Sequence, residues 1–303
     1  MNKDKTILKT LLLGSFFASL SAMLGGSTFV FTRYVVDSID PFTLSFLRYG
    51  LTGLILFLLS ISVYMNKKFA KADLIPMCFL GLAMITLFPN FMALGLEHTT
   101  AARAGLLYAT MPLCTIIIAY FFNIEKITLN KSLAVLLAIL GVSFCMSERV
   151  DNNFQDTLKG DFLMMIGVLS ASCFTVFSGK YLKKYGNIPV MIFVILIGTI
   201  LNLIISMIFG NSIISLLEIN KFEAAALLML IIPGGVVMMY CWGKALQLIS
   251  PTQAAISLGF NPLSAILLGS IILNEEITFK LGVGFISILM AIILANCKSK
   301  IKA

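Results

Sequence analysis

The stretch GLEHTTAARAGLLYATMPLCTIIIAYFFNIEKIT at residues 95–128 recurs without a gap as ALQLISPTQAAISLGFNPLSAILLGSIILNEEIT at residues 245–278. The shift of 150 residues places Pro112 on Pro262 and Glu125 on Glu275. Each copy reads as an apolar helix, a short polar break, a second apolar helix and a charged turn. A duplicated and almost wholly apolar unit predicts a transporter built from two related halves.

The composition places the chain in a membrane. Of its 303 residues, 59% are hydrophobic and 12% are charged, whereas soluble domains have about 45–50% and about 25%. A helix needs roughly 20 apolar residues to cross the hydrocarbon core. Ten apolar runs are long enough to be predicted as spans: 8–30, 42–63, 74–96, 101–122, 131–147, 161–182, 188–209, 224–247, 252–273 and 279–296.

The length of these runs predicts helices, because a barrel strand needs only about 9–11 alternating residues. The expected fold is therefore an all-α integral membrane protein with ten transmembrane helices in two five-helix repeats. The boundary is predicted after residue 150, with residues 1–150 as the first repeat and 151–303 as the second. The polar segment at 148–161 is the expected linker between them.

The distribution of charge predicts the orientation of the chain. If the N-terminus is cytoplasmic, 15 of the 22 basic residues and 3 of the 14 acidic residues lie on the cytoplasmic side. The positive-inside rule then places both termini in the cytoplasm. The net charge of +8 is accounted for as a topology signal, so no nucleic-acid partner is predicted.

Five spans per repeat is an odd number, so the second repeat enters the membrane from the opposite side. Glu125 is then expected at the inner face and Glu275 at the outer face. Such inverted repeats place a binding site near the bilayer midplane, at their interface.

Several other classes of protein find no support in the sequence. The first span follows Lys3, Lys5 and Lys9, but it is longer than a typical signal-peptide core, so it is expected to be retained. The six cysteines are scattered singly, and no zinc-protease or Walker A motif is present. We therefore predict no metal, no cofactor and no enzymatic activity.

Further motifs are GGSTFVFTRYVV in the first span, DPFTLSFLRYGL at the second and TTAARAGLLYATMPL at the fourth, with EKIT and NEEIT after the fourth and ninth. Together they resemble the EamA family of the drug/metabolite transporter superfamily, over nearly the whole chain. The resemblance implies a carrier in the inner membrane of a bacterium or archaeon, often an exporter of amino acids or related metabolites, working by alternating access. The family often has Trp where this chain has Gly25, which could widen a helix contact or the cavity.

Charged residues near the spans are the first candidates for substrate binding. Charge is costly inside a bilayer, so Arg48 in the second span is expected to have a specific structural or functional role. Its guanidinium could bind a substrate carboxylate, or it could cap backbone carbonyls. Arg103 marks the outer end of the third and fourth spans, where it could pair with Glu97 while His98 changes its protonation near neutral pH. A purely structural junction is the alternative reading.

Four prolines are predicted to interrupt helices in two repeat pairs. Pro112 and Pro262 each remove an amide donor from the middle of a span, and Pro89 and Pro233 do so in the third and eighth spans. A hinge beside a cavity and a simple packing kink are the two readings. The polar and aromatic residues on these helices are the predicted cavity wall: Asn90, Tyr108, Tyr240, Trp242, Gln253 and Asn261.

The leading hypothesis is a secondary transporter for a small polar metabolite, with a non-transporting scaffold or a channel as the alternative. No Asp or Glu is predicted deep in a span, which favours facilitated or exchange transport over proton coupling. The expected partners are the substrate and the lipid bilayer. The choice between import and export, and between monomer and homodimer, stays open.

Overall fold

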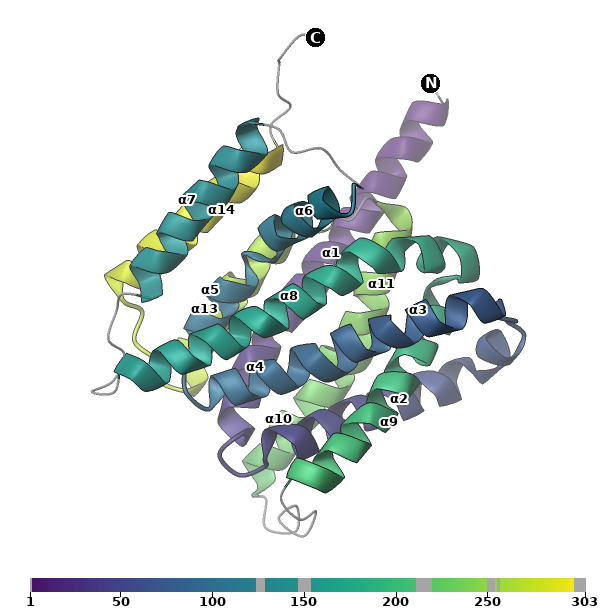
Figure 1. Cartoon of the computed structure of the whole chain (residues 1–303), viewed down its shortest axis with the longest axis horizontal. Coiled ribbons are helices and arrows are strands. Elements are labelled where there is room, and N and C mark those ends of the chain that lie inside the picture. Colours follow the sequence, from purple (N-terminus) through teal and green to yellow (C-terminus); the bar gives the residue numbers. More distant parts are fainter. Residues whose placement is uncertain are drawn as a thin grey trace.

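The computed structural model describes residues 2–123, 129–146, 154–210, 220–249, 254 and 257–296. Throughout these ranges every regular element is helical, and the long helices pack side by side (Figure 1). The elements are α1 (Asn2–Val35), α2 (Pro41–Met65), α3 (Lys71–Gly81), η1 (Leu82–Leu87), α4 (Phe88–Leu96), α5 (Ala101–Tyr108), α6 (Met111–Phe121), α7 (Leu129–Met146), α8 (Phe154–Tyr185), α9 (Asn187–Phe209), α10 (Lys221–Ile231), η3 (Ile232–Val237), α11 (Met238–Leu248), η4 (Ser257–Gly259), α13 (Phe260–Ile272) and α14 (Phe279–Asn296).

Among the described residues, seven helical segments are long and apolar enough to cross a membrane: Thr10–Val35, Pro41–Met65, Lys71–Leu96, Ala101–Phe121, Gln155–Tyr185, Asn187–Phe209 and Lys221–Leu248. Two shorter apolar helices, Ser257–Ile272 and Phe279–Ala291, accompany them. Many large apolar side chains, such as Leu59, Met207 and Phe279, point outward and are exposed. Such a surface suits lipid better than water. The prediction of an all-helical membrane protein is confirmed, and the chain is a multi-pass one.

Local sequence signals explain where individual helices begin. At the start of α2, Asp40 accepts hydrogen bonds from the amides of Phe42 and Thr43 at 3.1 and 3.0 Å, and Pro41 occupies the first turn. At the start of α10, Asn220 and Glu223 form a capping box. Both arrangements satisfy amides that a helix leaves without partners at its N-terminus.

Two π-helical turns lie 150 residues apart, η1 within the third predicted span and η3 within the eighth. Sequence analysis placed the interruptions at Pro89 and Pro233. Pro233 lies inside η3, whereas Pro89 follows η1 in the first turn of α4. A π-helical turn widens the helix and leaves carbonyls poorly matched to donors.

Polar side chains from neighbouring helices bond to these carbonyls. Pro89 has no amide hydrogen, so the carbonyl of Ile85, four residues earlier, lacks its α-helical donor. Asn202 of α9 donates to it from Nδ2 at 2.8 Å, and Asn90 in turn donates to Asn202 Oδ1 at 2.9 Å. At η3 the donors come from α2, where Thr52 bonds to the carbonyl of Ile231 at 3.2 Å.

The fourth and ninth predicted spans differ from a continuous kinked helix. α5 ends at Tyr108 and α6 begins at Met111, so Pro112 lies in the first turn of a new helix. There its missing amide hydrogen requires no partner. In the second half, the short η4 precedes α13, and Pro262 again lies near the start of a helix.

The helices of the two halves pack reciprocally. α1 of the first half lies against α11 and α13, and α8 of the second half lies against α4 and α6. α2 packs on α9, and α7 packs on α14 at one side of the molecule (Figure 1). Exchanging each helix of these six pairs for its counterpart 150 residues away gives the same pairs, and the largest buried cluster includes residues of both halves.

Candidate functional site

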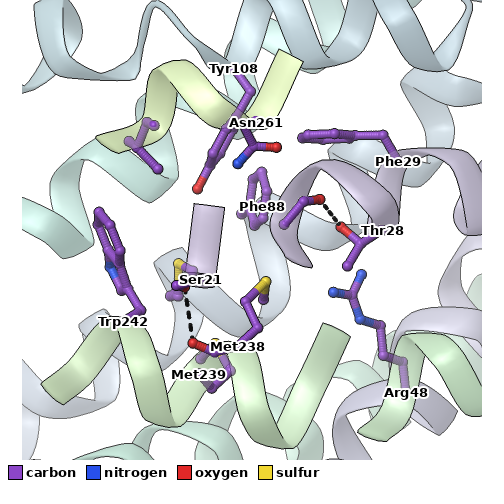
Figure 2. Close-up of a pocket in the computed structure, with 13 residues that line it drawn as sticks. Ser21, Thr28, Phe29, Arg48, Phe88, Tyr108, Met238, Met239, Trp242 and Asn261 are labelled. Carbon is purple, nitrogen blue, oxygen red and sulfur yellow. Dashed lines mark hydrogen bonds between the residues drawn. The ribbon is translucent and has the colours of Figure 1, made fainter. Parts of the chain in front are cut away.

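A central cavity lies between the two halves, with walls from six parts of the chain (Figure 2). Its volume is about 30 Å³, room for about two water molecules. Its lining residues are Ser21, Gly25, Thr28 and Phe29 from α1, Arg48 from α2, Met84 and Phe88 from η1 and α4, Tyr108 from α5, Met238, Met239 and Trp242 from α11, and Leu258 and Asn261 from η4 and α13. In this conformation the cavity is too small to hold a metabolite.

Arg48 brings a positive charge to this cavity. It is 3% exposed, and its Nη2 donates to the carbonyl of Gly234 in η3 at 2.9 Å. Its Nε has no hydrogen-bond partner, and no carboxylate among the described residues forms a salt bridge with it. The hydrogen bond to the Gly234 carbonyl thus engages Nη2 and leaves Nε without an acceptor. A buried charge without a counter-ion can attract an anionic group of a ligand.

Asn261 brings an unpaired acceptor to the same cavity. Its side chain is 1% exposed, and its Oδ1 has no hydrogen-bond partner. The neighbouring α1 makes room for it, since a Cβ added to Gly25 would lie 2.8 Å from Asn261 Nδ2. Glycine in place of a large aromatic at position 25 therefore leaves space for this amide.

The remaining wall is aromatic and sulfur-rich. The Tyr108 ring packs between Phe29 and Phe88, with ring centroids 5.5 and 5.4 Å apart. Trp242 of α11 is 4% exposed and lines the cavity. These rings offer an apolar surface that can contact a hydrocarbon or aromatic part of a ligand.

Four of the predicted site residues thus lie around the cavity: Arg48, Tyr108, Trp242 and Asn261. Asn90 lies elsewhere, in the hydrogen-bonded pair with Asn202. Tyr240 lines a different pocket, at the junction of α8 and α9. His98 is half-buried in the turn before α5, and Gln253 lies outside the described residues.

Arg103 also lies away from the cavity, and its partner differs from the predicted one. Its guanidinium forms a buried salt bridge with Asp161 of α8, which also accepts a hydrogen bond from Thr99 Oγ1 at 2.8 Å. The expected pairing with Glu97 is wrong, and desolvation raises the pKa of the Glu97 carboxyl. Because α8 begins at Phe154, Asp161 lies two turns inside a helix, and its side chain has no exposed surface.

Glu275 caps the start of α5, at the two residues that precede Arg103. Its Oε1 accepts from the amide of Ala101 at 2.8 Å and its Oε2 from that of Ala102 at 3.0 Å. A carboxylate from the end of the second half thereby caps a helix of the first half. Glu125, its sequence counterpart, lies outside the described residues.

Sequence analysis missed the part of the cavity that α1 provides. Ser21, Gly25 and Thr28 follow a spacing of four and three residues, which puts them on one face of a helix. The alignment of small and polar residues along a single face was the signal for a cavity wall.

Comparisons with known proteins agree with this architecture. The model of the EamA-like transporter family matches residues 12–147 and again residues 158–297. An uncharacterized transporter of Archaeoglobus fulgidus is 26% identical, over 92% of this chain and 96% of its own length. The uncharacterized transporter YoaV of Bacillus subtilis is 24% identical over 90% of this chain and 92% of its own length. A solved crystal structure matches with a TM-score of 0.65 at 16% identity, covering 95% of this chain and 96% of that one, and so shows the same fold.

Proposed function

Because this chain belongs to the EamA-like transporter family, we propose that it is a secondary transporter that carries an amino acid or a related small metabolite by alternating access. The observation that supports this most strongly is the pair of unsatisfied buried groups in the central cavity, the Arg48 guanidinium and the Asn261 amide oxygen. Both residues line the same small space where the two halves meet (Figure 2).

The chemistry of the two groups is complementary to a zwitterion. The free donors of Arg48 match a carboxylate, and the Asn261 Oδ1 matches an ammonium group. The rings of Phe29, Phe88 and Tyr108 would then contact the side chain of the substrate. An unsatisfied buried polar atom costs about 1–3 kcal/mol, so a ligand that pairs both groups binds favourably.

For the mechanism, we propose ten spans arranged as two inverted five-helix repeats, residues 1–150 and 151–303, with both termini in the cytoplasm. The gapless sequence repeat, the reciprocal packing and the π-helical turns 150 residues apart support this arrangement. Inverted repeats that exchange conformations open the cavity first to one side and then to the other. The small cavity fits an intermediate in this cycle. The proposed hinges are the irregular helices η1 and η3 and the helix breaks before Pro112 and Pro262.

Coupling to a proton gradient is the less favoured form of this mechanism. The one buried carboxylate that borders the described helices of both halves, Asp161, is occupied by Arg103 and Thr99. Within the central cavity, the described lining residues include no acidic side chain. We therefore propose facilitated or exchange transport of the substrate.

The test is transport by the purified protein in liposomes. Labelled amino acids should exchange saturably, and Arg48→Gln should reduce kcat/KM by about 10–100-fold, because a hydrogen bond to a charged group contributes about 1.5–3 kcal/mol. Asn261→Leu should also reduce it. Arg33→Gln, which removes an exposed arginine paired with Asp37, should not.

Three results would contradict the proposed role of Arg48 or the proposed transport function. Unchanged transport by Arg48→Gln for every substrate with a carboxylate would return Arg48 to a purely structural role. Unsaturable ohmic conductance in planar bilayers would favour a channel. No transport across a broad metabolite panel would favour a non-transporting scaffold.

A further inference from the structure

A second pocket lies at the end of the bundle where α8 turns into α9. Its volume is about 380 Å³, more than ten times that of the central cavity. Its walls come from the end of α2, the junction of α8 and α9, and α11. Four lysines line it: Lys67, Lys183, Lys184 and Lys244. We refer to it as the lysine pocket.

Only one of the four lysines is neutralised by a described carboxylate. Lys184 Nζ lies 2.6 Å from Asp73 Oδ2, which also accepts a hydrogen bond from the Tyr185 hydroxyl at 2.5 Å. Lys67, Lys183 and Lys244 form no salt bridge in the described part of the chain. Three like charges around one hollow repel each other, and an anion in the hollow relieves that repulsion.

The backbone adds further donors for an anion. α8 and α9 are joined through Gly186, which has φ 93°, and no side chain caps the N-terminus of α9. The amides of Asn187 and Ile188 in its first turn therefore have no side-chain acceptor, and both residues line the pocket. The N-terminus of a helix of 23 residues favours negative charge.

The wall also contains a buried acceptor. Asn187 is 5% exposed, its Nδ2 donates to the carbonyl of Tyr240 at 3.0 Å, and its Oδ1 has no partner. This oxygen lies against the backbone of α11, since a Cβ added to Gly243 would lie 1.8 Å from it, so the Asn187 amide positions the start of α9 against α11 and does not face the hollow. The apolar side chains of Val63, Ile188 and Pro189 complete the wall.

We propose that the lysine pocket binds the glycerophosphate group, either as the headgroup of an anionic phospholipid or as a soluble phosphate ester. The phosphate meets Lys67, Lys183 and Lys244 and the amides at the start of α9. Basic pockets between membrane helices are known to hold anionic headgroups. This inference is independent of the proposed transport reaction, which uses the central cavity.

The experiment compares two variants of equal charge. Lys183→Gln with Lys244→Gln removes two lysines of the pocket, and Lys68→Gln with Lys71→Gln removes two exposed lysines just beyond Lys67 that do not line it. Binding of phosphatidylglycerol to the full chain in uncharged detergent is measured by native mass spectrometry, with phosphatidylcholine as reference. The pocket variant should bind about 30-fold more weakly, since each lysine near such a charge contributes about 1 kcal/mol, whereas the control should change less than threefold.

A second arm separates the two sources of the group. Glycerol 3-phosphate is titrated against wild-type protein with bound phosphatidylglycerol. Displacement at micromolar concentration assigns the pocket to a soluble phosphate ester, and displacement only above millimolar assigns it to the lipid. The variant with Lys183→Arg and Lys244→Arg should retain binding of phosphatidylglycerol and shows that the pocket tolerates substitution. Equal weakening in the pocket variant and the control, or no preference for phosphatidylglycerol over phosphatidylcholine, overturns the proposal.

Discussion

The carboxylate of Asp161 on α8 pairs with the guanidinium of Arg103 on α5, and neither side chain is exposed by more than 4%. The pair joins a helix of the second half to a helix of the first half, 58 residues apart in sequence. A buried ion pair contributes little over an apolar pair of the same size, but breaking it leaves one charge without compensation.

This pairing gives the first prediction. Asp161→Asn or Arg103→Gln alone should lower the free energy of unfolding by about 3–5 kcal/mol, because each leaves a buried partner unsatisfied. The double variant Arg103→Met with Asp161→Leu should lose less than either single variant. Thermal unfolding in detergent measures all three, and additive losses in the double variant would show that the two groups act independently.

The second prediction concerns the donor that Asn202 supplies to the carbonyl of Ile85. Asn202→Leu should destabilise the protein by about 1–3 kcal/mol, since it leaves that buried carbonyl unsatisfied. Pro89→Ala restores a backbone amide four residues after Ile85, so adding it to Asn202→Leu should recover part of the loss. If Pro89→Ala makes the loss larger in unfolding experiments, the amide of Asn202 does not replace the missing donor.

Glycines in the helices give the third prediction. A Cβ on Gly26 would lie 2.0 Å from Ser264 Oγ and 2.2 Å from the carbonyl oxygen of Asn261, whereas a Cβ on Gly179 would meet nothing within 4 Å. Gly26→Ala should therefore cost about 1–3 kcal/mol through forced separation of α1 and α13. Gly179→Ala should be neutral or stabilise by up to about 1 kcal/mol through helix propensity. Equal melting temperatures for the two variants would contradict the close approach of α1 and α13.

The fourth prediction tests the cap on α5. Glu275→Ala should lower stability by about 1 kcal/mol, because the amides of Ala101 and Ala102 lose their acceptor and the helix N-terminus loses a negative charge. Glu276 is exposed and provides the matched control, so Glu276→Ala should change stability by less than about 0.5 kcal/mol. Urea or thermal unfolding of both variants distinguishes a specific cap from a general effect of charge.

The sequence predicted the helical class well, because apolar runs of membrane length leave few alternatives. It also located the irregular helices, since Pro89 and Pro233 remove donors wherever they lie. It did not predict π-helical turns, because these depend on Asn202 and Thr52, which reach the freed carbonyls from helices far away in sequence.

The candidate site was predicted in part for a similar reason. Arg48 and Asn261 are polar residues in apolar runs, so sequence alone singles them out. Asn90 and Tyr240 lie on the same helices as cavity residues but face away from the cavity, because the direction of each side chain depends on the irregular turns η1 and η3 beside them. The partner of Arg103 was missed because hydropathy starts the sixth span at Asp161, although the helix begins at Phe154.

The two π-helical turns, at Leu82–Leu87 and Ile232–Val237, lie at corresponding positions of the sequence repeat, which bears on how the protein evolved. A turn of this kind arises when one extra residue enters an α-helix. Two separate insertions at matching positions require a coincidence, whereas one insertion in a shared ancestor accounts for both. Under the proposed two-repeat organisation, the irregular helix is older than the duplication that produced the two repeats.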